Sequence, residues 1–172
     1  MKKLLFAISL SLLTLSSFAQ DKNKYAKHIT KTTVSTQDRW MTPEKSKGMI
    51  KSMEPLSIVK WRNKGEEPTM AVYLNVQGLT YIREKIFGGK ITFTDGDVLE
   101  FPDKRVSVKN IDTSNRDSGW MYSIASELSS EDLDKLINKD IEEVSVYIFK
   151  YPISKKKRKK IKGWSLAIKE AI

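Results

Sequence analysis

One cluster in this sequence has an unusual local chemistry, a run of six consecutive cations. It consists of Lys155, Lys156, Lys157, Arg158, Lys159 and Lys160. If the run is helical, six residues cover more than one turn of 3.6 residues, so charge surrounds the axis and no apolar face remains. We therefore expect the run to project into water, with docking beginning only near Ile161. Lysines also oppose the helix dipole at this end.

Such a run attracts an anionic partner: nucleic acid, lipid phosphate, lipopolysaccharide or another anionic envelope polymer, or an acidic protein. The basicity is local. Nine of the 31 Lys and Arg residues lie at Lys2, Lys3, 155–160 and Lys162, and the remaining 22 nearly balance the 21 Asp and Glu. We predict the six cations as contacts for an anionic ligand. The plain alternative is a solvated helix start that only aids solubility, as most charge runs do.

Residues that usually carry catalysis or bind metals are sparse. His28 is the only histidine, and the chain has no Cys. Thiol nucleophiles, Cys-based metal sites and the HExxH motif are therefore excluded. His28 lies in a Thr-rich stretch, and we interpret it as an ordinary strand or surface residue. The sequence predicts no cofactor and no metal site.

Paired carboxylates are the remaining catalytic option, because glycoside hydrolysis needs two at a defined separation. Glu142 and Glu143 are adjacent in a predicted strand and would point to opposite faces. Asp95 and Asp97 could hold Ca²⁺ with Asp103 only loosely, since their spacing differs from that of a calcium loop. Turn chemistry explains them. A hydrolase acting on envelope polymers with dispersed carboxylates remains the alternative to a binding module.

Aromatic side chains could bind sugars if they gathered on a wet sheet face. Trp61 and Tyr73 lie on neighbouring predicted strands and could form such a platform. We favour the interpretation that both pack in a second apolar layer, because a sandwich needs large residues on both sheets.

Residues 1–19 have the pattern of a secretory signal peptide: a charged start, an apolar run over residues 4–15, and small side chains at Ser17 and Ala19. The apolar run is too short to span a bilayer, which needs roughly 20 residues. Residues 20–172 then form a single globular β-rich domain, held together by packing without disulfides. We expect a periplasmic or secreted protein, exported by the cleavable signal peptide.

Hydrophobic periodicity predicts a mainly β (α+β) fold, an antiparallel β-sandwich or curved sheet of seven to eight short strands with two late helices. Residues 38–52 are predicted as mostly loop. Strands are predicted at residues 26–34, 55–63, 69–77, 90–101 (a hairpin), 106–111, 120–125 and 141–149, and helices at 130–137 and 154–172.

Three elements carry sharper predictions. In the hairpin, a two-residue turn would put Ile91 and Leu99 on opposite faces. A three-residue loop with a left-handed Gly96 pairs Ile91 with Leu99 and Phe93 with Asp97. We predict this loop, because it places the apolar side chains of both strands on one face, where they can be buried together. The strand at 141–149 is predicted to turn inward Val144, Val146 and Ile148. The terminal helix is predicted to bury one side formed by Ile161, Trp164, Ile168 and Ile172.

Two segments, KITFTDGDVLEF and SSEDLDKLINKDIEEVSVYIF, together with the basic terminal helix, resemble small secreted β-rich proteins of Gram-negative bacteria that form a domain of unknown function. The resemblance covers residues 70–172. Its motifs are structural, so it implies the fold and brings no catalytic residues.

Taken together, the sequence favours an exported non-catalytic binding or structural module of the bacterial envelope, with residues 155–160 as its contacts. The hydrolase is the rival. A protease-inhibitor or chaperone-like partner domain that uses a sheet edge is a third possibility.

Overall fold

The computed structural model describes residues 24–34, 37–43, 54–111 and 119–171. In these ranges the chain is mainly β, with ten antiparallel strands in two sheets, two longer helices and a helical turn at 24–26. The predicted mainly β architecture with late helices is confirmed. The predicted signal peptide lies outside the described residues.

The larger sheet has six strands in the order β1-β2-β3-β4-β8-β7, and every neighbouring pair is antiparallel. The long strands β3, β4 and β8 form its centre. The strands are β1 (Thr30–Val34), β2 (Gln37–Met41), β3 (Leu56–Asn63), β4 (Thr69–Gly78), β7 (Ser107–Asn110) and β8 (Trp120–Glu127).

The smaller sheet has the order β10-β9-β5-β6. Its strands are β5 (Gly89–Phe93), β6 (Val98–Glu100), β9 (Ile141–Val146) and β10 (Phe149–Pro152). In the β5–β6 hairpin Ile91 pairs with Leu99, and the N–H of Phe93 donates to the carbonyl of Asp97 at 2.9 Å. Gly96 has a left-handed φ of 87°. The predicted three-residue loop is therefore confirmed.

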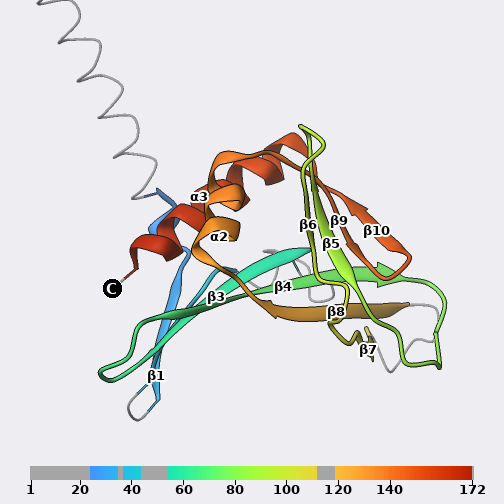
Figure 1. Cartoon of the computed structure of the whole chain (residues 1–172), viewed down its shortest axis with the longest axis horizontal. Coiled ribbons are helices and arrows are strands. Elements are labelled where there is room, and N and C mark those ends of the chain that lie inside the picture. Colours follow the sequence, from blue (N-terminus) through green and yellow to red (C-terminus); the bar gives the residue numbers. More distant parts are fainter. Residues whose placement is uncertain (1–23, 35–36, 44–53, 112–118, 172) are drawn as a thin grey trace, which may run out of the picture.

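Helices α2 (Ser130–Asn138) and α3 (Lys155–Glu170) lie side by side, next to the smaller sheet and on the same side of the larger sheet (Figure 1). Ser129 caps α2. Its Oγ accepts from the N–H of Asp132 at 3.1 Å, and the Asp132 carboxylate accepts from the N–H of Ser129 at 3.2 Å. This capping box fixes the start of the helix.

One apolar core joins both sheets to both helices. The buried side of α3 includes Ile161, Trp164 and Ile168, as predicted, together with Ser165 and Ala167, while Ile172 lies outside the described residues. Other core side chains include Leu56, Ile58, Val72, Leu74, Val76, Phe93, Tyr122, Ile124, Leu133, Leu136, Val144 and Val146.

The prediction that residues 38–52 are mostly loop was wrong at its start. Residues Gln37–Met41 form strand β2, which pairs with β1 and β3. Only Trp40 in this strand is buried. A strand with a single buried side chain has no clear alternation, so the sequence pattern did not reveal it. The rest of the predicted loop from residue 44 lies outside the described residues.

The prediction of one continuous strand at 141–149 was also wrong. Tyr147 and Ile148 form a two-residue turn between β9 and β10, whose Val146 and Phe149 pair. Ile148 is 64% exposed instead of facing inward. Tyr147 adopts a left-handed φ of 54°, which in tight hairpins is normally the place of Gly or Asn. The turn therefore has no sequence signature.

Candidate functional site

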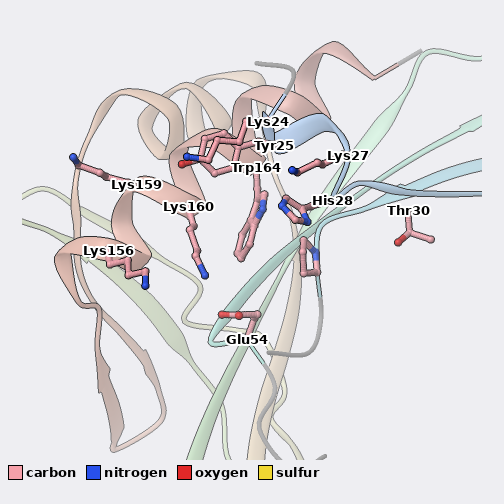
Figure 2. Close-up of a pocket in the computed structure, with 11 residues that line it drawn as sticks. Lys24, Tyr25, Lys27, His28, Thr30, Glu54, Lys156, Lys159, Lys160 and Trp164 are labelled. Carbon is pink, nitrogen blue, oxygen red and sulfur yellow. The ribbon is translucent and has the colours of Figure 1, made fainter. Parts of the chain in front are cut away.

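A pocket of about 630 Å³ lies between the start of α3 and the segment that precedes β1 (Figure 2). This volume is within the range of small-molecule sites, roughly 300–1,000 Å³. The pocket is lined by Lys24, Tyr25, Lys27, His28, Thr30, Pro43, Glu54, Lys156, Lys159, Lys160 and Trp164.

The α3 wall follows from helical spacing. Lys156, Lys160 and Trp164 are four residues apart and therefore lie on one face, with Lys159 beside them. Ser154 starts the helix, because its side chain accepts a hydrogen bond from the N–H of Lys157 at 3.4 Å. A serine cap of this kind offsets the unfavourable placement of lysines at the positive end of the dipole.

The opposite wall is the turn at residues 24–28, which docks on α3 through Tyr25. A Cβ added to Gly163 would lie only 2.2 Å from Cδ2 of Tyr25, so the ring rests directly on the helix backbone. The turn is closed by the N–H of His28, which donates to the carbonyl of Tyr25 at 3.0 Å. Our interpretation of His28 as an ordinary residue missed its place in the pocket lining.

Trp164 contributes an aromatic surface to the pocket. The residue is 6% exposed, and its indole Nε1 has no hydrogen-bond partner within the described part of the chain. A buried donor without an acceptor costs about 1–3 kcal/mol. The indole lies among the labelled lysines and His28 in Figure 2. The site therefore holds an unused hydrogen-bond donor.

The pocket is strongly cationic. Five lysines line it, against one carboxylate, that of Glu54. Glu54 is already paired with Lys157, with Nζ and Oε2 3.0 Å apart and side chains 20% and 6% exposed respectively. Among the residues that the structure describes, none of the five lysines has a carboxylate within 4.0 Å. A concave site lined by one sign of charge concentrates the electrostatic potential.

The six predicted contact residues divide into two groups. Lys155, Lys156, Lys159 and Lys160 are exposed, and the last three line the pocket. Lys157 and Arg158 are half-buried: Lys157 pairs with Glu54, and Nε of Arg158 donates to the carbonyl of Ile153 at 3.0 Å. The expectation that the whole run projects into water was wrong, because long cationic side chains can lay their stems against the body.

The far end of α3 is also fixed. Lys60 of β3 is only 9% exposed, and its Nζ donates to the carbonyls of Lys169 at 3.1 Å and Ala171 at 2.7 Å. Burial lowers the pKa of Lys60, with a smaller contribution from Arg62. A cation at the last carbonyls satisfies acceptors that the helix itself leaves open. The helix that carries the pocket is therefore tied to β3 at its end and to Glu54, just before β3, at its start.

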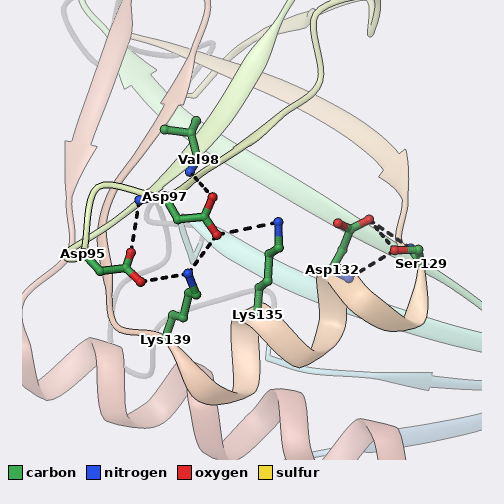
Figure 3. A network of polar contacts seen from close by, with 7 residues as sticks. All are labelled: Asp95, Asp97, Val98, Ser129, Asp132, Lys135 and Lys139. Atoms are coloured by element: carbon green, nitrogen blue, oxygen red, sulfur yellow. Dashed lines mark hydrogen bonds and ion pairs between the residues drawn. The ribbon is translucent and has the colours of Figure 1, made fainter.

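The carboxylates of the β5–β6 loop serve a structural purpose (Figure 3). Nζ of Lys139 lies 2.8 Å from Asp95 and 2.9 Å from Asp97, and Lys135 lies 3.6 Å from Asp97. Hydrogen bonds from Lys139 are the main cause of the lowered pKa of both carboxyls. Within the described ranges no group of three or more His, Cys, Asp or Glu is placed to hold a metal.

Trp61 and Tyr73 border one shallow depression of about 240 Å³ on the large sheet, together with Arg39. Both rings are half-buried. The sequence had placed them on neighbouring strands, and they do lie on the paired strands β3 and β4.

Comparison of the chain with protein-family models, curated proteins and solved structures found no match. None of the helices in the described ranges is long and apolar enough to cross a membrane.

Proposed function

We propose that this chain is an exported, non-catalytic binding module of the bacterial envelope, which holds an anionic ligand in the cationic pocket. The observation that carries the proposal is the convergence of lysines from two distant segments. Lys24 and Lys27 come from the start of the described chain, and Lys156, Lys159 and Lys160 from its last helix. If the cationic run only aided solubility, it would not be expected to line one pocket together with lysines from a distant segment. Export is supported by the signal-peptide pattern of residues 1–19.

The chemistry of the lining favours an anion with concentrated charge. Each lysine is a flexible point charge with three donors, a common partner of phosphate oxygens. Five such groups repel one another when the pocket is empty, and an anion between them relieves this repulsion. The bound anion would contact the exposed ends of these lysines.

The hydrolase alternative finds less support. Glu54 is the single carboxylate among the described lining residues, whereas glycoside hydrolysis by paired carboxylates needs two that face each other. A second depression of about 580 Å³ contains Asp38 and Glu66. There the hydroxyl of Thr33 donates to Asp38 at 2.7 Å and is the main cause of the lowered pKa of that carboxyl. A general acid needs the opposite shift.

Co-sedimentation of residues 20–172 with anionic phospholipid vesicles and with lipopolysaccharide tests the proposal. The variant K156Q/K159Q/K160Q removes three pocket charges. The matched control K85Q/K104Q/K109Q removes three charges from exposed lysines outside the pocket. We expect the pocket variant to lose about tenfold or more in affinity for at least one probe and to show a weaker salt dependence. Equal losses in both variants, or no binding of either probe to the unmodified chain, would contradict the proposal.

A further inference from the structure

We propose that the pocket takes a small organic phosphate, in which one phosphoryl group is carried on an apolar or aromatic body. This inference rests on the proposed function and adds the chemical class of the ligand. The proposed ligand is a small amphiphilic phosphate. It differs from inorganic phosphate, which has no apolar body, and from a polyanion, which would bind only along the surface.

The size of the pocket argues against a bare anion. A water molecule has a share of liquid volume of about 30 Å³, so a space of about 630 Å³ is many times larger than one small ion needs. A phosphate bound alone would leave most of the pocket to water. A ligand that fills it must carry a body as well as a head group.

The lining offers a different surface to each part of such a ligand. The exposed ends of Lys24, Lys27, Lys156, Lys159 and Lys160 provide the charge. The partly exposed ring of Tyr25 and the small exposed part of Trp164, 6% of that residue, provide apolar contacts for the body of a ligand. The phosphoryl group then meets the lysines while the body covers the aromatic surface.

The indole of Trp164 supplies an independent argument. Its Nε1–H is a donor only, it is buried, and it has no acceptor in the described part of the chain. A purely apolar ligand would leave this donor unsatisfied, and because the Nε1 atom is itself buried, a ligand oxygen meets it through a small shift of the indole toward the pocket. A phosphate ester brings acceptor oxygens next to an apolar body, which is the combination that this donor requires.

Glu54 is the one carboxylate among the described lining residues. It is buried and held by Lys157 at 3.0 Å. Each anionic group of a ligand close to Glu54 would be repelled by its carboxylate. A single phosphoryl group on a neutral body meets less of this repulsion than a ligand with several anionic groups.

Isothermal titration calorimetry on residues 20–172 tests the ligand class with four probes. 1-Naphthyl phosphate and monomeric dihexanoyl phosphatidic acid combine a head group with a body. Inorganic phosphate is the head group alone, and 1-naphthol is the body alone. We expect at least one of the two esters to bind about tenfold or more tightly than either part, a difference of about 1.4 kcal/mol. A preference for the naphthyl ester indicates a soluble aromatic phosphate, and a preference for the lipid indicates a lipid headgroup; both support the proposal.

The variant W164F tests the role of the indole N–H, because Phe keeps an aromatic ring and removes the donor. We expect it to weaken ester binding about five- to tenfold, the effect of one charge-assisted hydrogen bond. The matched control is W120F. Trp120 is half-buried and stacks on Tyr81 with ring centroids 4.3 Å apart, outside the pocket. Thermal unfolding of both variants checks that they fold. The comparison of the four probes uses the unmodified chain, so it tests the proposal even if a variant does not fold.

The inference is overturned if inorganic phosphate binds as tightly as both esters, or if W164F behaves like W120F. In that case the proposed function survives provided that K156Q/K159Q/K160Q still weakens binding of inorganic phosphate or of anionic vesicles. If that variant has no effect on any probe, the pocket is not an anion site and both proposals fail.

Discussion

The ring of Tyr25 rests on the backbone of Gly163, so closely that a Cβ at Gly163 would come within 2.5 Å of three ring atoms. Glycine inside a helix costs about 1 kcal/mol relative to alanine. The contact explains why α3 carries one in its middle. It also joins the two segments that form the walls of the pocket.

A double-mutant cycle on this pair should show strong coupling. We expect Gly163→Ala to lower the free energy of unfolding by about 1 kcal/mol, because the new methyl group displaces the ring. In a Tyr25→Ala background the same change should raise it by about 0.5–1 kcal/mol through helix propensity alone. Urea denaturation of the four proteins measures both. The same effect of Gly163→Ala in the two backgrounds would show that the contact carries no energy.

Lys60 should stabilise the protein by holding the C-terminal end of α3. Lys60→Met keeps most of the side-chain volume and removes both hydrogen bonds to the last carbonyls. Hydrogen bonds of a charged donor are worth about 1.5–3 kcal/mol. The cost of burying the Lys60 charge, which also lowers its pKa, offsets part of this stabilisation. We therefore expect Lys60→Met to lower the free energy of unfolding by about 1 kcal/mol. Lys64→Met, at an exposed position just after β3, is the control and should change stability little. A gain in stability for Lys60→Met would mean that desolvation outweighs the hydrogen bonds.

The cluster of Lys139 with Asp95 and Asp97 should make stability depend on pH at both extremes. Both carboxyls have a pKa lowered from 3.8, so their contribution is present above that value and is lost as the pH falls through the lowered values. The pKa of Lys139 is raised from 10.5 by the same contacts. Its contribution is therefore present below that value and is lost as the pH rises through the raised one.

Urea midpoints of Lys139→Met and the unmodified chain provide the measurement. The variant should be less stable at about pH 7, and the difference should shrink as the pH falls through the lowered pKa values of the two carboxyls, because their protonation removes the partners of Lys139. Lys150→Met, at an exposed lysine of the smaller sheet, serves for comparison. A difference that stays constant across this range would contradict the electrostatic explanation.

Replacing Tyr147 should increase the stability of the protein. Its φ of 54° costs roughly 1 kcal/mol for a residue with a side chain, and its side chain is largely exposed. We expect Tyr147→Gly to raise the free energy of unfolding by about 1 kcal/mol. Ile148→Gly, in the same turn but without a left-handed φ, should instead lower it. Thermal unfolding distinguishes the two, and a loss of stability in Tyr147→Gly would show that its ring makes contacts worth more than the strain.

The parts of the fold that the sequence predicts well are those in which one local signal decides. The β5–β6 register follows from alternation and a left-handed Gly96. The start of α2 follows from a serine cap, which the sequence leaves open between Ser129 and Ser130 and the structure assigns to Ser129. The sequence did not predict strand β2, because only one of its side chains is buried. It also did not predict the turn at Tyr147, because the turn lacks Gly or Asn.

Half of the pocket was within reach of the sequence. The cationic run gave Lys156, Lys159 and Lys160, and helical spacing could have added Trp164. An isolated Gly163 in a helix was a further hint of close packing. The wall that contains Lys24 and Lys27 could not be predicted, because a tertiary contact across more than a hundred residues leaves no local pattern.

The contact of α3 with the turn at residues 24–28 ties assembly of the pocket to completion of the fold. Contacts between segments so distant along the chain are slow to form, since loop-closure entropy opposes them. A chain shortened before residue 155 would keep the strands of both sheets and lose one entire wall of the pocket. The pocket would therefore form last during folding, and its presence would indicate that the first and last described segments have come into contact.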